Sequence, residues 1–146
     1  MPLDGIRVID WTIWQQGPVA SVMLGDLGAE VIKVEERVSG DPGRGILRAQ
    51  GLDLRDRPNF YFEANNRNKK SLAVDLKRPE GVEIVRRLVD HADVFVQNFR
   101  QGVAGRSPLR WRRSGADCAH AAWRRRGRAA PPRPCGSSAR RHPPGR

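Results

Sequence analysis

The amino-acid sequence predicts an α/β fold built on a doubly wound parallel sheet. Two observations carry that prediction. Short apolar runs typical of buried strands alternate with segments of helical periodicity, from residue 5 to residue 99. The first helical segment has about ten residues, a length that suits the right-handed crossover between two parallel strands. A sharp change of composition near residue 106 marks the end of this pattern.

The first unit of the pattern reads strand, helix, strand. Ile6, Val8 and Ile9 in "GIRVIDW" predict a buried strand. Pro18 suits the first position of a helix, because its missing N–H would have no partner there anyway, and Gly28 suits the position after the last turn. "AEVIKVEE" predicts the second strand. The expected buried face of the helix consists of Val19, Val22, Met23 and Leu27.

The second unit follows an irregular stretch, rich in glycine and arginine, from Ser39 to Asn59. "KSLAVDL" and "DVFVQNF" predict two further buried strands. Between them, "RPEGVEIVRRLVDHA" predicts a helix that starts near Pro79 and carries acids early and bases late, which complements the helix dipole. Together the two units predict the start of a Rossmann-like sheet. The expected apolar face of this helix consists of Val82, Val85, Leu88 and Val89.

The C-terminal part of the chain has a different composition. Residues 1–104 carry 15 basic and 15 acidic side chains, whereas residues 105–146 carry 12 arginines and a single acid, Asp117. The only large aliphatic residue of that tail is Leu109. Such a segment cannot bury enough apolar surface to offset the entropy cost of ordering its backbone. We therefore expect an α/β unit over residues 1–106 and a disordered basic tail over residues 107–146.

Three interpretations of this tail remain. Its arginines could neutralise phosphates while Trp111 and Trp123 stack on bases, which would make binding to nucleic acid non-specific. Its Pro-Pro pairs could form a stiff spacer. The tail contains no lysine, and its dominant residues (Arg, Ala, Gly and Pro) are those of GC-only codons. This composition favours the third interpretation, a GC-rich gene read out of frame.

No feature of the sequence points to a metal, a leader or a membrane. Cys118 and His120 lack the further ligands that a tetrahedral metal site needs. The N-terminus has no basic-then-apolar run. No stretch approaches the roughly 20 apolar residues that span a bilayer. We therefore expect a cytoplasmic protein without a covalently bound cofactor.

Ligands of doubly wound folds bind beyond the carboxyl ends of the parallel strands. The loop after the first strand, "WTIWQQGP", contains neither GxGxxG nor a P-loop, which argues against a dinucleotide site. Gln15 and Gln16 offer amide groups at a helix N-terminus, a position that favours an anion. An ordinary capping loop explains the same two residues equally simply.

Other polar residues allow no single interpretation. The basic stretch "NNRNKKS", residues 65–71, is compatible with phosphate binding and equally with a solvated strand edge protected by lysines. His91 suits a surface role at a helix C-terminus. Asp26, Asp75 and Asp93 are explained as acids of a helix surface or a strand end. We therefore assign no catalytic residue and no metal ligand.

Three motifs, in order along the chain, resemble one family. "LDGIRVIDWTIWQQGPVASVMLGDLGAEVIKVE", "NRNKKSLAVDLKRPEG" and "ADVFVQNFRQGV" are similar to the N-terminal part of the family III CoA-transferases. That family includes formyl-CoA transferase, carnitine CoA-transferase and the α-methylacyl-CoA racemases. The resemblance covers residues 3–106, whereas family members are several times longer. It implies a partial Rossmann-like large domain.

The resemblance also implies contacts to coenzyme A, supplied as the acyl-CoA substrate. Lys77 and Arg106 would pair with its phosphates, and Phe99 would flank an apolar part of it. Where the family often has "VER", with an arginine near the adenine, this chain has Glu36, and the arginine follows as Arg37. The implied contact residues are Gln15, Gln16, Arg37, Val74, Asp75, Leu76, Lys77, Asn98, Phe99 and Arg106.

The implied reaction is transfer of CoA from an acyl-CoA to a carboxylic acid through an aspartyl intermediate. The family nucleophile lies downstream of the matching region and has no counterpart in this chain, nor has the racemase His/Asp pair. We therefore expect an inactive fragment, and the transferase and racemase alternatives stay open. Family members form an interlocked homodimer, which we do not expect this fragment to form. The remaining alternatives are a non-catalytic CoA-binding module and a nucleic-acid binder that uses the basic tail.

Overall fold

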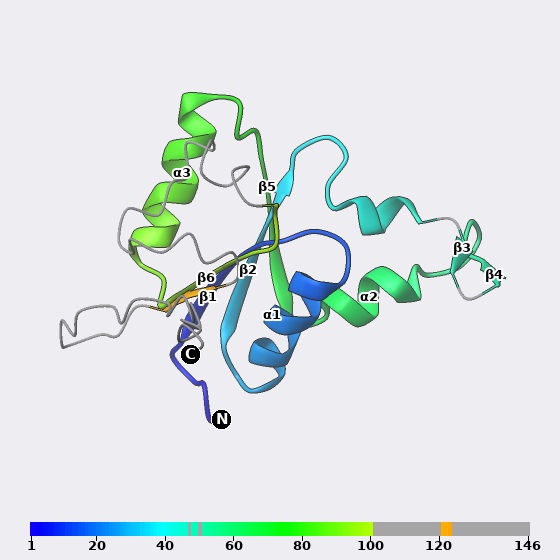
Figure 1. Cartoon of the computed structure of the whole chain (residues 1–146), viewed down its shortest axis with the longest axis horizontal. Helices are drawn as coiled ribbons and strands as arrows, with labels where there is room; N and C mark the ends of the chain where they lie inside the picture. Colours follow the sequence, from blue (N-terminus) through cyan, green and yellow to red (C-terminus); the bar gives the residue numbers. More distant parts are fainter. Residues whose placement is uncertain (47, 50, 101–120, 124–146) are drawn as a thin grey trace, which may run out of the picture.

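The computed structural model describes residues 1–46, 48–49, 51–100 and 121–123. They form a sheet with helices on both faces (Figure 1). Its strands β1 (Arg7–Trp11), β2 (Glu30–Glu36), β5 (Lys69–Val74) and β6 (Val94–Gln97) are parallel and lie in the order β5-β2-β1-β6. The predicted α/β class and the doubly wound parallel arrangement are confirmed.

Each face of the sheet is covered by one crossover helix. Helix α1 (Gln16–Asp26) connects β1 to β2 on one face, and α3 (Pro79–Asp90) connects β5 to β6 on the other (Figure 1). Helix α3 begins at Pro79, as the sequence predicts. Its first turn lies so close to the end of β5 that a Cβ on Gly81 would stand 2.1 Å from the carbonyl oxygen of Asp75. Only glycine permits this close approach.

The apolar core has two layers, because successive side chains of a strand point to opposite faces. On the α3 face, Ile9, Val34 and Phe95 pack with Val82 and Val85 of the helix. The layer on the α1 face consists of Val8, Ala29, Val31, Val94 and Val96, with Leu24 of the helix packed against it. The predicted apolar face of α3 is confirmed, since its Leu88 and Val89 also pack against the first layer.

The predicted apolar face of α1 is only partly correct, and Val19 within it is half-buried. Val22 is buried, but Met23 and Leu27 are exposed. The helix instead buries Gly17, Pro18 and Ser21. Its buried side turns toward polar groups of β1 and β5 as well as toward the apolar layer, so the spacing of its apolar residues did not reveal its orientation.

The stretch between β2 and β5 contains more regular structure than the sequence predicted. It holds a 3-10 turn η1 (Pro42–Gly45), the short antiparallel pair β3 (Arg48–Ala49) and β4 (Leu52–Asp53), and helix α2 (Phe60–Asn66). Figure 1 shows β3 and β4 far from the sheet, whereas α2 lies beside α1. Asn59 caps α2, because its side chain accepts a hydrogen bond from the backbone N–H of Phe62 at 3.0 Å.

Most of residues 107–146 lie outside the described residues, so the disordered tail stays a prediction. The exception is β7 (Ala121–Trp123), which pairs antiparallel with β6 at the edge of the sheet. The composition of the tail predicted no strand there. Among the described helices, none combines the length and apolar character that crossing a bilayer requires.

Candidate functional site

The candidate site lies at the carboxyl edge of the parallel sheet. The chain passes from β1 to β2 and on to β5 in one direction, and then returns so that β6 lies on the other side of β1. The strand order therefore reverses between β1 and β6. This reversal is the switch point of the sheet, and doubly wound folds bind ligands at such a point. The loop after β1 and the segment after β6 flank this point.

These two segments are joined by the side chain of Asn98. Its Oδ1 accepts a hydrogen bond from the backbone N–H of Ile13 at 3.0 Å, and its Nδ2 donates to the carbonyl of the same residue at 2.8 Å. Both polar atoms of the Asn98 carboxamide thus hold the β1–α1 loop. The resemblance implied a direct contact between Asn98 and CoA, whereas the structure gives this carboxamide two bonds within the protein.

Gln15 and Gln16 lie exposed where the loop enters α1. Gln15 is the residue that precedes the first turn, and its side chain forms no capping hydrogen bond to this helix. The N–H groups of a first turn without such a cap favour an anion. The neighbouring Gly17 is buried, and a Cβ there would stand 2.5 Å from Cβ and Cγ2 of Thr12 and 3.0 Å from Cγ of Asn98. The close approach of helix, loop and Asn98 requires glycine at this position.

Aromatic rings line the β6 side of the site. The ring of Phe99 lies against that of Trp11, with centroids 4.6 Å apart, and the Phe99 N–H donates to Oε1 of Gln97 at 2.8 Å. Trp14 is half exposed in the opposite loop, and its backbone has φ of +69°. The contact of Phe99 with CoA that the resemblance implied stays a prediction. Arg106, the last implied contact, lies outside the described residues.

The remaining implied residues form a second group, at the ends of β2 and β5. Nε of Arg37 lies 3.8 Å from Oδ2 of Asp75, and Oδ1 of Asp75 accepts a hydrogen bond from the Lys77 N–H at 2.9 Å. Lys77 is exposed, Leu76 is half-buried, and Val74 is buried in the core layer of the α3 face. The ends of β1 and β5 are two strand spacings apart, about 10 Å, so an extended ligand could contact both groups.

The loop after β2 is ordered by its own acid. Oε2 of Glu36 accepts hydrogen bonds from the N–H groups of Val38 and Ser39 and from the Ser39 hydroxyl, at 2.7–2.9 Å. These bonds, the backbone bond of Ser39 first, hold the pKa of Glu36 below its usual range. Glu36 is therefore engaged by its own loop, and the exposed Arg37 is the side chain of this turn that can reach a ligand.

A network of buried charges lies beneath the β1–α1 loop. Oδ2 of Asp10 accepts from the Ser21 hydroxyl at 2.6 Å and from Nζ of Lys69 at 2.9 Å. Lys69 also donates to the carbonyl of Pro18 and to Oδ1 of Asn66. Burial lowers the pKa of Lys69, although the charge of Asp10 opposes that change. This network fastens the first turns of α1 to β1, β5 and the end of α2.

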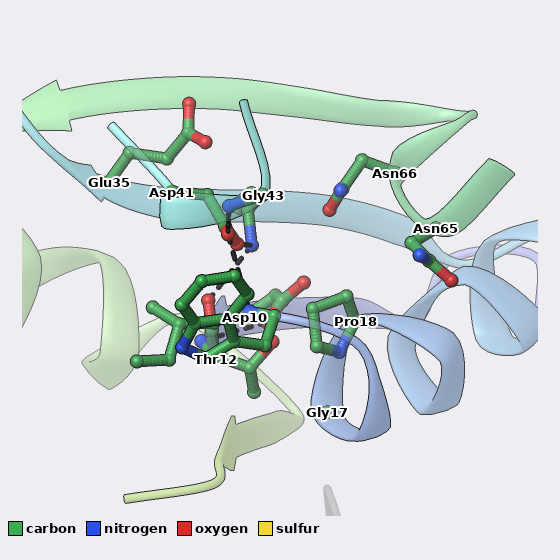
Figure 2. A network of polar contacts seen from close by, with 12 residues as sticks. Asp10, Thr12, Gly17, Pro18, Glu35, Asp41, Gly43, Asn65 and Asn66 are labelled. Carbon is green, nitrogen blue, oxygen red and sulfur yellow. Dashed lines mark hydrogen bonds and ion pairs between the residues drawn. The ribbon is translucent and has the colours of Figure 1, made fainter. Parts of the chain in front are cut away.

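A second buried pair lies on the other side of the loop. Nζ of Lys33 stands 2.7 Å from Oδ2 of Asp41 and donates to the carbonyl of Thr12 at 2.9 Å. Oδ1 of Asp41 accepts from the N–H of Trp14 at 3.2 Å and from that of Gly43 at 2.8 Å. Figure 2 shows Asp41 and Gly43 on one side of this network, with Asp10 and Thr12 facing them.

A third acid, Glu35, ties β2 to η1 and β5. Arg44 donates to both of its carboxylate oxygens, at 3.1 and 2.8 Å, and the Ser71 hydroxyl donates at 2.6 Å. Burial alone would raise the pKa of Glu35, but the hydrogen bonds from Arg44 and Ser71 and the charges of Arg44 and Lys33 lower it. The Arg44 guanidinium also stacks over the ring of Phe62, 3.9 Å from its centroid.

Four residues that support the site were not predicted from the sequence: Asp10, Lys33, Asp41 and Lys69. The available signal was polarity within strand patterns, because a charged residue between buried apolar neighbours needs a buried partner. The stretch "NNRNKKS" lies at the amino end of β5, at the edge opposite the site. Its Lys69 is buried, and its exposed Lys70 pairs with Glu30 at 2.7 Å. Within the described part of the chain, no three His, Cys, Asp or Glu side chains gather where they could hold a metal ion.

Comparison with known proteins identifies the unit that carries this site. The sequence pattern of CoA-transferase family III matches residues 3–116, which is most of the chain. The chain belongs to CoA-transferase family III. Its N-terminal motifs, read above as a resemblance, thus mark true membership of the family.

Two CoA-transferases resemble this chain over 69–75% of its length. The succinyl-CoA:glutarate CoA-transferase of Mus musculus is 48% identical over 101 residues, which cover 69% of this chain and 22% of that protein. The formyl-CoA:oxalate CoA-transferase of Rhodopseudomonas palustris (strain TIE-1) is 42% identical over 109 residues, which cover 75% of this chain and 25% of that protein. The chain thus spans about a quarter of the length of these relatives.

Solved structures of the family share the fold. Rv3272 of Mycobacterium tuberculosis, in its orthorhombic form, superposes with a TM-score of 0.65 at 44% identity, over 74% of this chain and 29% of that one. A CAIB/BAIF family protein from Brucella suis superposes with a TM-score of 0.59 at 42% identity, over 70% of this chain and 27% of that one. The α/β unit therefore shares its fold with a part of each of these longer chains.

Proposed function

We propose that the carboxyl edge of this sheet binds coenzyme A, and that the protein to which this unit belongs transfers CoA from an acyl-CoA to a carboxylic acid. The relatives named above transfer CoA between succinyl-CoA and glutarate, or between formyl-CoA and oxalate. The proposal extends that chemistry to this chain as a class of reaction, without a particular acyl group or acceptor.

One observation supports the proposal most directly. The Asn98 carboxamide bridges the switch point through its two hydrogen bonds to Ile13. The first turn of α1 follows this loop, with Gln15 and Gln16 exposed and without a capping hydrogen bond from the Gln15 side chain. The N–H groups of a helix N-terminus favour a partly negative oxygen, and the carbonyl oxygens of the pantetheine arm and of the thioester can accept from them. The half-buried Phe99, whose ring lies against that of Trp11, offers apolar surface at the end of β6 for the pantetheine arm.

The second group of residues supports the rest of an extended ligand. Arg37 and Lys77 are exposed cations at the ends of β2 and β5. CoA combines a polyanionic nucleotide with a long, flexible, mostly uncharged arm, so a ligand of this kind can contact cations and apolar surface several ångströms apart. In this proposal Arg37 and Lys77 bind phosphates, and the loop around Gln15 lies nearer the thioester.

The test is an NMR titration of the isotope-labelled chain with CoA into the millimolar range, so that weak binding is also detected. We expect the largest shifts at the amides of residues 13–17, 75–78 and 98–100. Pantetheine, which lacks the phosphates, should perturb residues 13–17 and 98–100 but not residues 75–78. Shifts confined to the amino edge of the sheet, or no shifts with CoA, would refute the proposal.

A further inference from the structure

Lys33 and Asp41 form an ion pair that is almost completely removed from solvent. Their side chains are 2% and 1% exposed, and Nζ and Oδ2 are 2.7 Å apart. Removing two charges from water is costly, and a buried pair is often no more stabilising than apolar residues of similar volume. Stabilisation of the fold alone therefore does not explain why this pair is present. Its hydrogen bonds to the β1–α1 loop do.

Each member of the pair also binds the backbone of the β1–α1 loop. Lys33 donates to the carbonyl of Thr12, and Asp41 accepts from the N–H of Trp14. The peptide groups of Ile13, between these two residues, are held from the opposite side by Asn98. Three consecutive residues of the loop are thus fixed by side chains from β2, from the turn before η1 and from the end of β6.

The loop needs this restraint because Trp14 has a left-handed backbone, with φ of +69°. That conformation is unfavourable for a residue with a Cβ, so it persists only when the surroundings impose it. The N–H of Trp14 points at Oδ1 of Asp41, which is itself fixed by the N–H of Gly43 and by the pairing of Oδ2 with Lys33. Gln15 and the first turn of α1 follow directly, so the backbone turn at Trp14 sets their direction.

We propose that Lys33 and Asp41 are positioning residues for the candidate site. The charge of Lys33 fixes the Asp41 carboxylate, Asp41 holds Trp14 in the left-handed conformation, and that conformation aims the first turn of α1 at the switch point. The pair touches no ligand itself. This inference rests on the proposed function, because the direction of that turn matters only if the turn binds CoA.

The test compares two double variants of similar size. Lys33→Met/Asp41→Asn removes both charges and keeps a side-chain oxygen that can accept from Trp14, whereas Lys33→Met/Asp41→Leu removes that acceptor as well. Neither leaves an unpaired buried charge, so both are expected to fold. Hydrogen exchange in the absence of ligand is the first measurement. We expect the Trp14 amide to exchange about tenfold faster, or more, in the Leu variant than in the Asn variant. Amides in the centre of β1 should exchange at similar rates in both.

The second measurement is CoA affinity, with Val85→Ala as a control for general destabilisation, since Val85 is buried on the far face of the sheet. We expect the Leu variant to bind CoA about tenfold more weakly than the Asn variant, and Val85→Ala to bind like the wild type. Equal Trp14 exchange in the two double variants would overturn the positioning role. If the wild-type chain fails to bind CoA, the proposed function is refuted, and the exchange measurement alone then decides whether the pair positions the loop.

Discussion

The carboxamide of Asn98 brackets the peptide groups of Ile13, accepting from its N–H at 3.0 Å and donating to its carbonyl at 2.8 Å, across 85 residues of sequence. A side chain that satisfies both backbone groups of one residue acts as a short piece of sheet between two loops. It pairs the N–H and the carbonyl of Ile13 in a partly buried place. It also connects the end of β6 to the loop before α1.

Replacing Asn98 should therefore weaken the fold as well as the site. Asn98→Ala leaves the N–H and the carbonyl of Ile13 without their partners, which we expect to cost about 1–3 kcal/mol of unfolding free energy. Urea denaturation followed by circular dichroism measures this loss. Arg100→Ala, an exposed change in the same segment, serves as the control and should be nearly neutral. A neutral Asn98→Ala would mean that the bracket contributes nothing to stability.

Two glycines of α1 predict opposite outcomes for the same substitution. Gly17→Ala would place a Cβ 2.5 Å from the Thr12 side chain, so we expect overpacking to cost about 1–3 kcal/mol. A Cβ on Gly25 meets Cγ2 of Val31 at 3.4 Å, an ordinary contact, and alanine is the better helix former. Gly25→Ala should thus be neutral or stabilise the chain by up to about 1 kcal/mol. Thermal unfolding of both variants decides, and equal effects would contradict the close approach at Gly17.

The buried pair of Asp10 and Lys69 predicts strong coupling. Lys69→Met leaves the Asp10 carboxylate buried without its cation, and we expect a loss of about 3–5 kcal/mol. The double variant Asp10→Asn/Lys69→Met removes both charges and should recover a large part of that loss. A double-mutant cycle from urea denaturation gives the coupling. Additive effects of the two substitutions would show that the pair does not act as a unit.

Glu35 predicts a pH dependence of stability. Its folded pKa lies below the ordinary value of 4.5, so the unfolded chain binds a proton more readily than the folded chain. The stabilisation is complete above about pH 4.5 and is lost as the pH falls through the lower, folded pKa. Wild type should exceed Glu35→Gln in stability at neutral pH, and the two should converge in acid. Parallel curves at all pH values would contradict the role of Arg44 and Ser71 in lowering this pKa.

Lys77 and Lys70 offer a matched test of the proposed phosphate contact, because they lie at opposite ends of the β5 region. Lys77→Ala should weaken CoA binding by up to about fivefold, the worth of one exposed ion pair, and the loss should shrink as salt is added. Lys70→Ala removes the same charge at the amino edge and should leave CoA affinity unchanged. Titrations at low and moderate salt measure both. Equal losses would indicate general electrostatic attraction in place of a site.

The sequence predicted the parallel strands and α3 because their apolar patterns depend on burial alone. It missed α2, whose residues Phe60–Asn66 include three aromatics but no long apolar stripe. The signal was Asn59, a favoured N-cap residue directly before the helix. It also misjudged α1, where Ser21 is buried because the Asp10 carboxylate stands beside it, while Met23 is exposed. A residue's partner across the fold is not visible in local periodicity.

The same limit applies to the site. The carboxyl-end loops were predictable from the order of strands and helices, and so was Gln15 within the first of them, whereas Lys77 was implied only by the family resemblance. That Asn98 holds Ile13, or that Asp41 accepts from Trp14, depends on distances set by the whole sheet. Lys33 shows the difficulty most clearly, since a lysine within "VIKVE" gives no local sign of the aspartate eight residues later that pairs with it.

The position of β6 also has a consequence for the order in which the molecule assembles. Among the described parallel strands β6 comes last along the chain, yet it pairs with β1, the first, and Asp93 just before it accepts a hydrogen bond from the Arg7 N–H across 86 residues. Until the ribosome has released β6, one edge of β1 has no partner from the later strand, and unpaired strand edges invite association with other chains. The nascent chain therefore carries this open edge until β6 emerges, and the reversal of strand order between β1 and β6 forms only when that edge is filled.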